Sequence, residues 1–169
     1  MNRGGRPELL PRYRLIEYRG QAFASSSYSE NHGAERAFRY QFGSHQPWAS
    51  ASFPARHRVW FRFDHKAVLA KIGFSTVNGA VHNLVKTPEK FDVIGSSDCD
   101  SEGTTLSHVA LIVEDAGFKG EVDEFKAWII PEEKRRLYKC WGLRVHSTTG
   151  SVPITQVQNM LMWEVRLRE

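Results

Sequence analysis

The chain has 169 residues, of which 41% are hydrophobic and 12% aromatic, so its composition supports one folded domain and excludes a disordered chain. Its formal net charge of +4 is only mildly basic, and the runs Arg56-His57-Arg58 and Lys134-Arg135-Arg136 are too short for a dense basic stripe. We therefore expect no sequence-specific nucleic-acid partner.

Residues 1–11 are rich in glycine, arginine and proline, and we predict that they form a flexible lead-in to one domain spanning residues 12–169. Residues 33–38 suggest a short helical turn. From residue 59 onward apolar and polar side chains alternate, which is the pattern of β-strands. The predicted strands are, in chain order, 59–64, 69–74, 91–96, 109–113, 125–129, 141–145 and 161–168.

These short strands, separated by turns rich in Gly, Pro, Ser and Asn, predict an all-β fold, either a sandwich or a barrel. In the last strand, Leu161, Trp163 and Val165 share one side, and Met162 and Glu164 share the other. We place Trp163 in the core together with Phe61, so that replacing either with alanine would cost about 3–5 kcal/mol of stability.

Residues 1–20 contain no apolar segment of the kind found in signal peptides, and no stretch approaches the roughly twenty apolar residues of a membrane span. We expect no transmembrane segment, and a cytoplasmic location unless the chain is a module of a longer protein. The two cysteines, Cys99 and Cys140, lack metal-site spacing, and the favoured interpretation is two separate thiols. A disulfide stays an open alternative, because sequence does not give the distance between their Cα atoms.

The sequence also lacks the nucleophile elbow Gly-x-Ser-x-Gly, the phosphate loop Gly-x-x-x-x-Gly-Lys and the zinc motif His-Glu-x-x-His. Carboxylates that could form a glycosidase pair lie in loops that nothing distinguishes from ordinary solvated turns. We predict that the chain is not an enzyme.

Three predicted loops instead gather the residue types of a binding site, in segments 28–33, 48–58 and 76–83. Arginine, asparagine and histidine hydrogen-bond to sugar hydroxyls, and an aromatic ring can stack on the apolar face of a pyranose. Trp48 is the candidate stacking platform, with burial in the core as its alternative; for the polar residues a solvated turn is the alternative. The candidate ligand-binding residues are Asn31, His32, Trp48, Arg56, His57, Asn78 and His82.

The order and spacing of eight segments resemble the discoidin, or coagulation-factor C-type, domain of the galactose-binding-like β-sandwich superfamily. The resemblance implies a jelly-roll-like sandwich of two antiparallel sheets, which is not catalytic and binds glycans, anionic phospholipid head groups or proteins through loops at one end. It extends over roughly residues 21–167. The matching segments are 24–27, 34–38, 48–50, 60–64, 72–75, 91–98, 138–145 and 162–165.

The chain departs from this family in ways that bear on its ligands. Many relatives bind structural calcium, and Glu164 matches one ligand position, but Arg39-Tyr40 stand where the family usually has Asp-Gly. Calcium is therefore an open alternative, and no cofactor is required. The loops also lack a protruding pair of large apolar residues, which disfavours membrane insertion. The favoured function is a carbohydrate-binding, lectin-like module, and the alternative is a protein-interaction or assembly module; the oligomeric state is left open.

Overall fold

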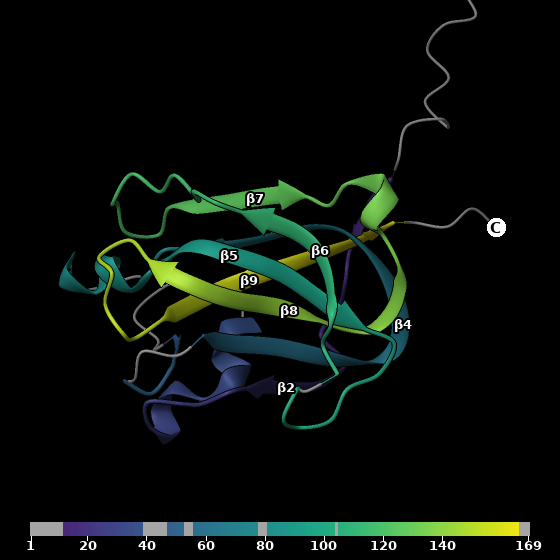
Figure 1. The fold of residues 1–169 in the computed structure, drawn as a ribbon, viewed down its shortest axis with the longest axis horizontal. Helices are drawn as coiled ribbons and strands as arrows, with labels where there is room; N and C mark the ends of the chain where they lie inside the picture. Colours follow the sequence, from purple (N-terminus) through teal and green to yellow (C-terminus); the bar gives the residue numbers. More distant parts are fainter. Residues whose placement is uncertain (1–11, 39–46, 53–55, 78–80, 104, 166–169) are drawn as a thin grey trace, which may run out of the picture.

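The computed structural model describes residues 12–38, 47–52, 56–77, 81–103 and 105–165 (Figure 1), with the backbone alone for residues 81–83. Its strands are β1 (Tyr13–Leu15), β2 (Gly20–Ala24), β3 (Trp48–Ala49), β4 (His57–Ser75), β5 (Pro88–Ser96), β6 (His108–Val113), β7 (Phe125–Ile129), β8 (Leu137–Thr148) and β9 (Gln156–Val165). Its 3₁₀ helices are η2 (Glu30–His32), η3 (Ala34–Phe38), η4 (Val81–Lys86) and η5 (Glu132–Lys134). The helical turn predicted for residues 33–38 corresponds to η3.

The strands form a sandwich whose two antiparallel layers share the long strand β4. The first half of β4 pairs with β2 and β8, and this layer continues through β5 to β6. The second half pairs with β7 and β9, and β9 also pairs with β1 and β3. The predicted all-β sandwich is confirmed.

One detail of the strand prediction is wrong, because residues 59–64 and 69–74 belong to the single strand β4. The exposed residues Asp64, His65 and Lys66 separate two apolar stretches, and for this reason the pattern predicted two strands. They include neither glycine nor proline, and the backbone instead bends at an irregularity in the pairing with β8, between Arg62 and Ala67. This bend carries the strand from one layer to the other.

Aromatic side chains from both layers fill the space between the sheets. Phe74 on the second half of β4 contacts Phe91 on β5, with ring centroids 5.4 Å apart. Phe61 and Phe63 lie 4.8 Å apart on the first half of β4 and are both buried. The burial predicted for Phe61 is confirmed.

The placement of Trp163 in the core is wrong. Along the last part of β9 the buried residues are Met160, Met162 and Glu164, whereas Trp163 is partly exposed on the outer face. There the Lys71 ammonium lies 4.8 Å from the ring centroid of Trp163. The alternation of β9 was correct, but both of its faces carry apolar residues, so the pattern did not tell which one is buried.

The interpretation of the cysteines as separate thiols is also wrong, since Cys99 and Cys140 form a disulfide with their Cα atoms 6.3 Å apart. They belong to a second apolar cluster on the outer face of the first layer, together with Trp60, Ile94 and Leu106. The loop between β5 and β6 covers this cluster. Trp60 lies on the face of β4 that also carries the polar residues Arg62 and Asp64, and it is fully buried in this cluster.

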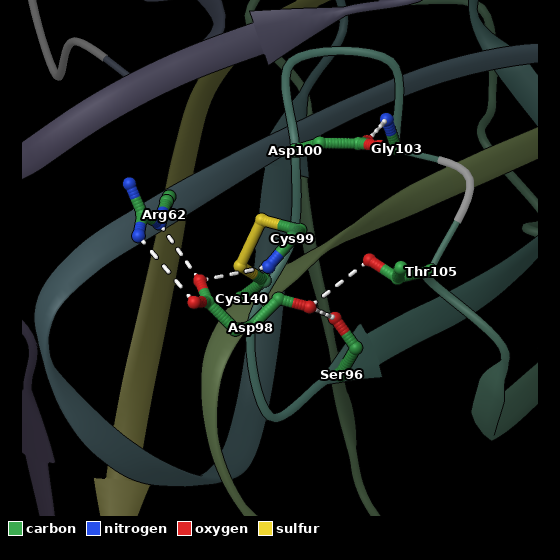
Figure 2. A network of polar contacts seen from close by, with 8 residues as sticks. All are labelled: Arg62, Ser96, Asp98, Cys99, Asp100, Gly103, Thr105 and Cys140. Carbon is green, nitrogen blue, oxygen red and sulfur yellow. Dashed lines mark hydrogen bonds and ion pairs between the residues drawn. A yellow bond between two sulfur atoms is a disulfide. The ribbon is translucent and has the colours of Figure 1, made fainter.

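Polar contacts hold this loop in place around Asp98 (Figure 2). The Asp98 carboxylate accepts hydrogen bonds from Arg62 Nε and from the Cys99 backbone N–H, both at 2.9 Å, and hydrogen bonding from Arg62 is the first cause of its lowered pKa. The Gly103 N–H donates to Asp100 at 2.8 Å. Gly103 has a φ of +70°, and a Cβ there would lie 2.7 Å from the Trp60 ring, so this turn requires glycine.

The two ends of the sandwich differ (Figure 1). One end carries η2, η3, η4 and the connection from β8 to β9. The other end carries the bend of β4, η5 and the connection from β5 to β6. We call the first of these the loop end. None of the helices in the described ranges is long and apolar enough to cross a membrane.

Candidate ligand-binding cleft

A cleft of about 550 Å³ opens at the loop end, where β4 begins and β8 ends. Its wall comes from segments far apart in the sequence, and antiparallel pairing of His57 on β4 with Val145 on β8 brings them together. The volume lies within the range of small-ligand sites. The lining residues are Arg56–His57, Val145–Thr148, Ser151–Pro153 and Thr155.

The connection from β8 to β9 forms one side of the cleft and is tied to the sheet. His57 is buried, and its Nε2 hydrogen-bonds to the Pro153 carbonyl at 2.9 Å. The Thr148 hydroxyl accepts from the Val152 N–H at 3.0 Å and lies 3.2 Å from the Val152 carbonyl. Ser151 adopts a φ of +54°, which completes the tight turn. The wall is therefore largely formed before a ligand arrives.

Behind the cleft, a buried carboxylate orients one of the lining side chains. Asp92 Oδ2 on β5 accepts hydrogen bonds from His146 Nε2 at 2.8 Å and from Arg144 Nη2 at 2.8 Å. Burial raises the pKa of Asp92, but the hydrogen bonds and charges of Arg144 and His146 outweigh it, so the pKa lies below its ordinary value. Asp92 is therefore ionised at neutral pH and fixes the His146 ring at the cleft.

Replacing Asp92 with asparagine is expected to lower the free energy of unfolding at neutral pH by about 2–3 kcal/mol, since it removes the charge that compensates Arg144. A carboxyl whose pKa is lowered by folding stabilises the protein above its ordinary pKa of 3.8, and this contribution is lost as the pH falls through the folded-state value. Urea unfolding at pH 7 and at pH 3 should therefore show a difference between wild type and Asp92→Asn that shrinks in acid.

Asp115→Asn, in an exposed loop, is the control and should change stability little at either pH. A loss for Asp92→Asn that stays constant with pH would contradict the assigned role of the Asp92 charge.

Of the predicted site residues, Arg56 and His57 lie in the cleft wall. Asn31 and His32 lie on η2, outside the cleft lining, and His32 Nδ1 hydrogen-bonds to Ser29 Oγ at 2.7 Å. Burial, and then the charges of Arg36 and Lys86, lower the pKa of His32. The ring of Tyr28, which is 60% exposed, lies edge-on to His32 with centroids 5.5 Å apart. Ligand contacts for these residues stay predictions.

The stacking platform predicted for Trp48 is wrong. Its side chain is fully buried, and its Nε1 donates to the Ser26 carbonyl at 3.0 Å, so neither ring face can reach a sugar. Its alternative, burial in the core, is confirmed. Asn78 lies outside the described residues, and His82 is on η4 with its side chain outside them.

The surroundings of Glu164 do not fit a calcium ion. Its Oε1 accepts a hydrogen bond from Arg14 Nε at 3.0 Å and is also paired with Arg14 Nη2. A guanidinium at this position repels a cation and uses the lone pairs that would bind it. Within the described ranges, no three His, Cys, Asp or Glu residues are grouped as metal ligands. Glu164 instead ties β1 to β9.

The cleft also contains residues that the sequence did not single out, chiefly His146, Ser147 and Ser151. In the sequence these residues follow the predicted strand 141–145, but their adjacency to Arg56 depends on the pairing of β4 with β8. The signal in the sequence was a histidine and a serine directly after a predicted strand, with a second serine four residues later.

No protein-family model matches the sequence, and no curated protein matches it. Several solved structures share the fold.

A chitosan-binding module of a chitosanase/glucanase from Paenibacillus sp. IK-5 superposes with a TM-score of 0.63 and 13% sequence identity, and the match covers 88% of this chain and 98% of that module. An F5/8 type C domain from Bacteroides fragilis has a TM-score of 0.65 and 13% identity, over 92% and 98%. A family 32 carbohydrate-binding module from Clostridium perfringens NanJ, solved with galactose, has a TM-score of 0.60 and 10% identity, over 85% and 93%.

These similarities extend over most of each chain. Because the sequence identities are only 10–13%, they show a shared fold and nothing more. The discoidin-like, galactose-binding-like fold that the eight sequence segments predicted is thereby confirmed.

Proposed function

We propose that this discoidin-like β-sandwich is a non-catalytic carbohydrate-binding module that holds a glycan in the cleft at its loop end. One observation carries the proposal. A preformed cleft with Arg56, His146 and several hydroxyl groups in its wall lies at one end of a fold whose solved examples include modules for chitosan and galactose.

The chemistry of the cleft suits a sugar. The Arg56 guanidinium, the His146 ring and the Ser147 and Ser151 hydroxyls offer hydrogen bonds to the hydroxyl groups of a saccharide. Val152 and Pro153 provide a small apolar surface against the C–H groups of a pyranose. A cleft of about 550 Å³ accommodates one or two sugar rings.

A glycan-array screen of the purified domain, followed by calorimetry with the best sugar, tests this function. Arg56→Ala is expected to weaken sugar binding at least about tenfold, because it removes one or two hydrogen bonds from a charged donor. The melting temperature should stay unchanged, because Arg56 is exposed. Arg19→Ala is the matched control, since Arg19 is also exposed but lies at the opposite end, beside the bend of β4. Equal losses in both variants would contradict the cleft as the binding site.

Calcium is not part of this proposal, and adding a chelator should leave binding unchanged. The disulfide between Cys99 and Cys140 favours function in an oxidising compartment over the cytoplasmic location expected from the sequence.

A blank array would favour the second candidate, a protein-interaction module. One observation supports it. On the outer face of the second layer, Leu15, Trp163, Lys71 and Ile129 are successive cross-strand partners on β1, β9, β4 and β7. Leu15 and Ile129 are about half exposed. A row of partly exposed side chains that are mostly apolar is typical of a contact surface.

A further inference from the structure

The ionisable groups of the cleft wall are all bases. Among the described lining residues there is neither aspartate nor glutamate, whereas Arg56, His57 and His146 all face the cleft. Within the part of the chain that the structure describes, no carboxylate contacts the Arg56 guanidinium. The wall therefore presents hydrogen-bond donors and positive charge.

The nearest acidic group behind the wall does not cancel this charge. The Asp92 side chain is buried, and its Oδ2 accepts hydrogen bonds from Arg144 Nε at 3.1 Å, from Arg144 Nη2 at 2.8 Å and from His146 Nε2 at 2.8 Å. The charge of Arg144 balances that of Asp92. Among the described residues, Arg56 is therefore left in the cleft wall without a carboxylate that balances its charge.

The wall also lacks the aromatic ring on which a neutral sugar commonly stacks. The described lining contains no tryptophan, tyrosine or phenylalanine, and Trp48 is fully buried. Since Val152 and Pro153 offer only a small apolar surface, most of the binding strength must come from polar contacts. Hydrogen bonds to an ionised acceptor are roughly twice as strong as those between neutral groups, and an arginine can bind a carboxylate through two parallel N–H groups.

We infer that the cleft selects an acidic saccharide, one whose sugar carries a carboxylate or a sulfate, with Arg56 as the residue that recognises the anion. This inference rests on the proposed glycan-binding function. Ser147 and Ser151, which line the same cleft, then bind hydroxyl groups of the sugar. His146, held by Asp92, lines the same wall.

Calorimetry with matched saccharides tests the inference. The ligands are tetrasaccharides of galacturonic and mannuronic acid, the methyl esters of both, and a sulfated galactose disaccharide with its unsulfated form. Wild type is expected to bind at least one acid about tenfold more tightly than its neutral counterpart, and the preference should fall as salt is added. The acid that binds best identifies the anionic group.

In Arg56→Gln the preference for the acid should collapse while the melting temperature stays unchanged, and Arg56→Lys should restore part of it. Arg19→Gln, at the opposite end, should keep the full preference. Equal binding of acid and neutral forms by wild type, or binding of neutral array sugars alone, would overturn the inference and leave the proposed function standing. Failure to bind any of these sugars or any glycan on the array would overturn both.

Discussion

Replacing Trp141 with alanine is expected to lower the free energy of unfolding by about 4–5 kcal/mol, close to the limit for a single core substitution. Trp141 on β8 is fully buried, with its ring centroid 5.4 Å from that of Tyr138. Its Nε1 donates to the Ala67 carbonyl at 3.0 Å, at the point where β4 bends between the two layers. The variant would thus leave a large cavity and an unpaired buried carbonyl group.

The matched control is Trp163→Ala, which also removes a tryptophan but from β9 in the other layer. Because Trp163 is partly exposed and contacts mainly Lys71 and the edge of Phe125, its loss should cost only about 1–2 kcal/mol. Urea unfolding followed by far-UV circular dichroism measures both, so that the missing indole does not affect the signal. Similar losses in the two variants would contradict the register of β8 and β9.

The contrast between these tryptophans shows how far the strand pattern could predict the fold. Alternation located the strands, and the order of eight segments predicted the discoidin-like sandwich. Alternation is symmetric, however, and on β9 both Trp163 and Met162 are apolar, so only the pairing of β9 with β4 decides which one faces the other sheet. The bend of β4 escaped prediction for a similar reason, because its cause is a pairing irregularity and not a turn residue.

The sequence predicted only part of the candidate site, because the rest depends on contacts between segments that are distant in the sequence. Arg56 and His57 stood out as basic residues in a loop. His146 is 89 positions after His57, and nothing in its local sequence distinguishes it from a surface histidine. Asp92 was hidden within an apolar stretch, where its role depends on Arg144 directly across from it in the β5–β8 pair. Trp48 was predicted to bind a ligand but does not line the cleft. A tryptophan is a suitable residue for stacking on a sugar, but the pairing of β3 with β9 buries Trp48.

Removing the disulfide is expected to have the second largest effect on stability. The bond closes a loop between positions 41 residues apart, and the chain entropy that it removes from the unfolded state corresponds to about 4 kcal/mol. Both sulfur-bearing side chains are buried against Trp60 and Leu106, so Cys99→Ala with Cys140→Ala also loses apolar contacts in this cluster. The double variant should therefore unfold at a markedly lower urea concentration than wild type.

Reduced wild type is the control, because it lacks the disulfide but keeps both cysteine side chains and their apolar contacts. It should show the greater part of the loss in unfolding free energy that the double variant shows. Thiol titration of the native, unreduced protein should find no free cysteine. Two reactive thiols, or a double variant as stable as wild type, would contradict the bond. The disulfide ties the connection between β5 and β6 to Cys140 on β8, which pairs with Arg62 beside the bend of β4. This bend and this connection lie at the end of the sandwich opposite the loop end (Figure 1). Reduced protein that is still folded should therefore keep its affinity for ligand, because the wall around Arg56 is held by β4, β8 and the Asp92 network.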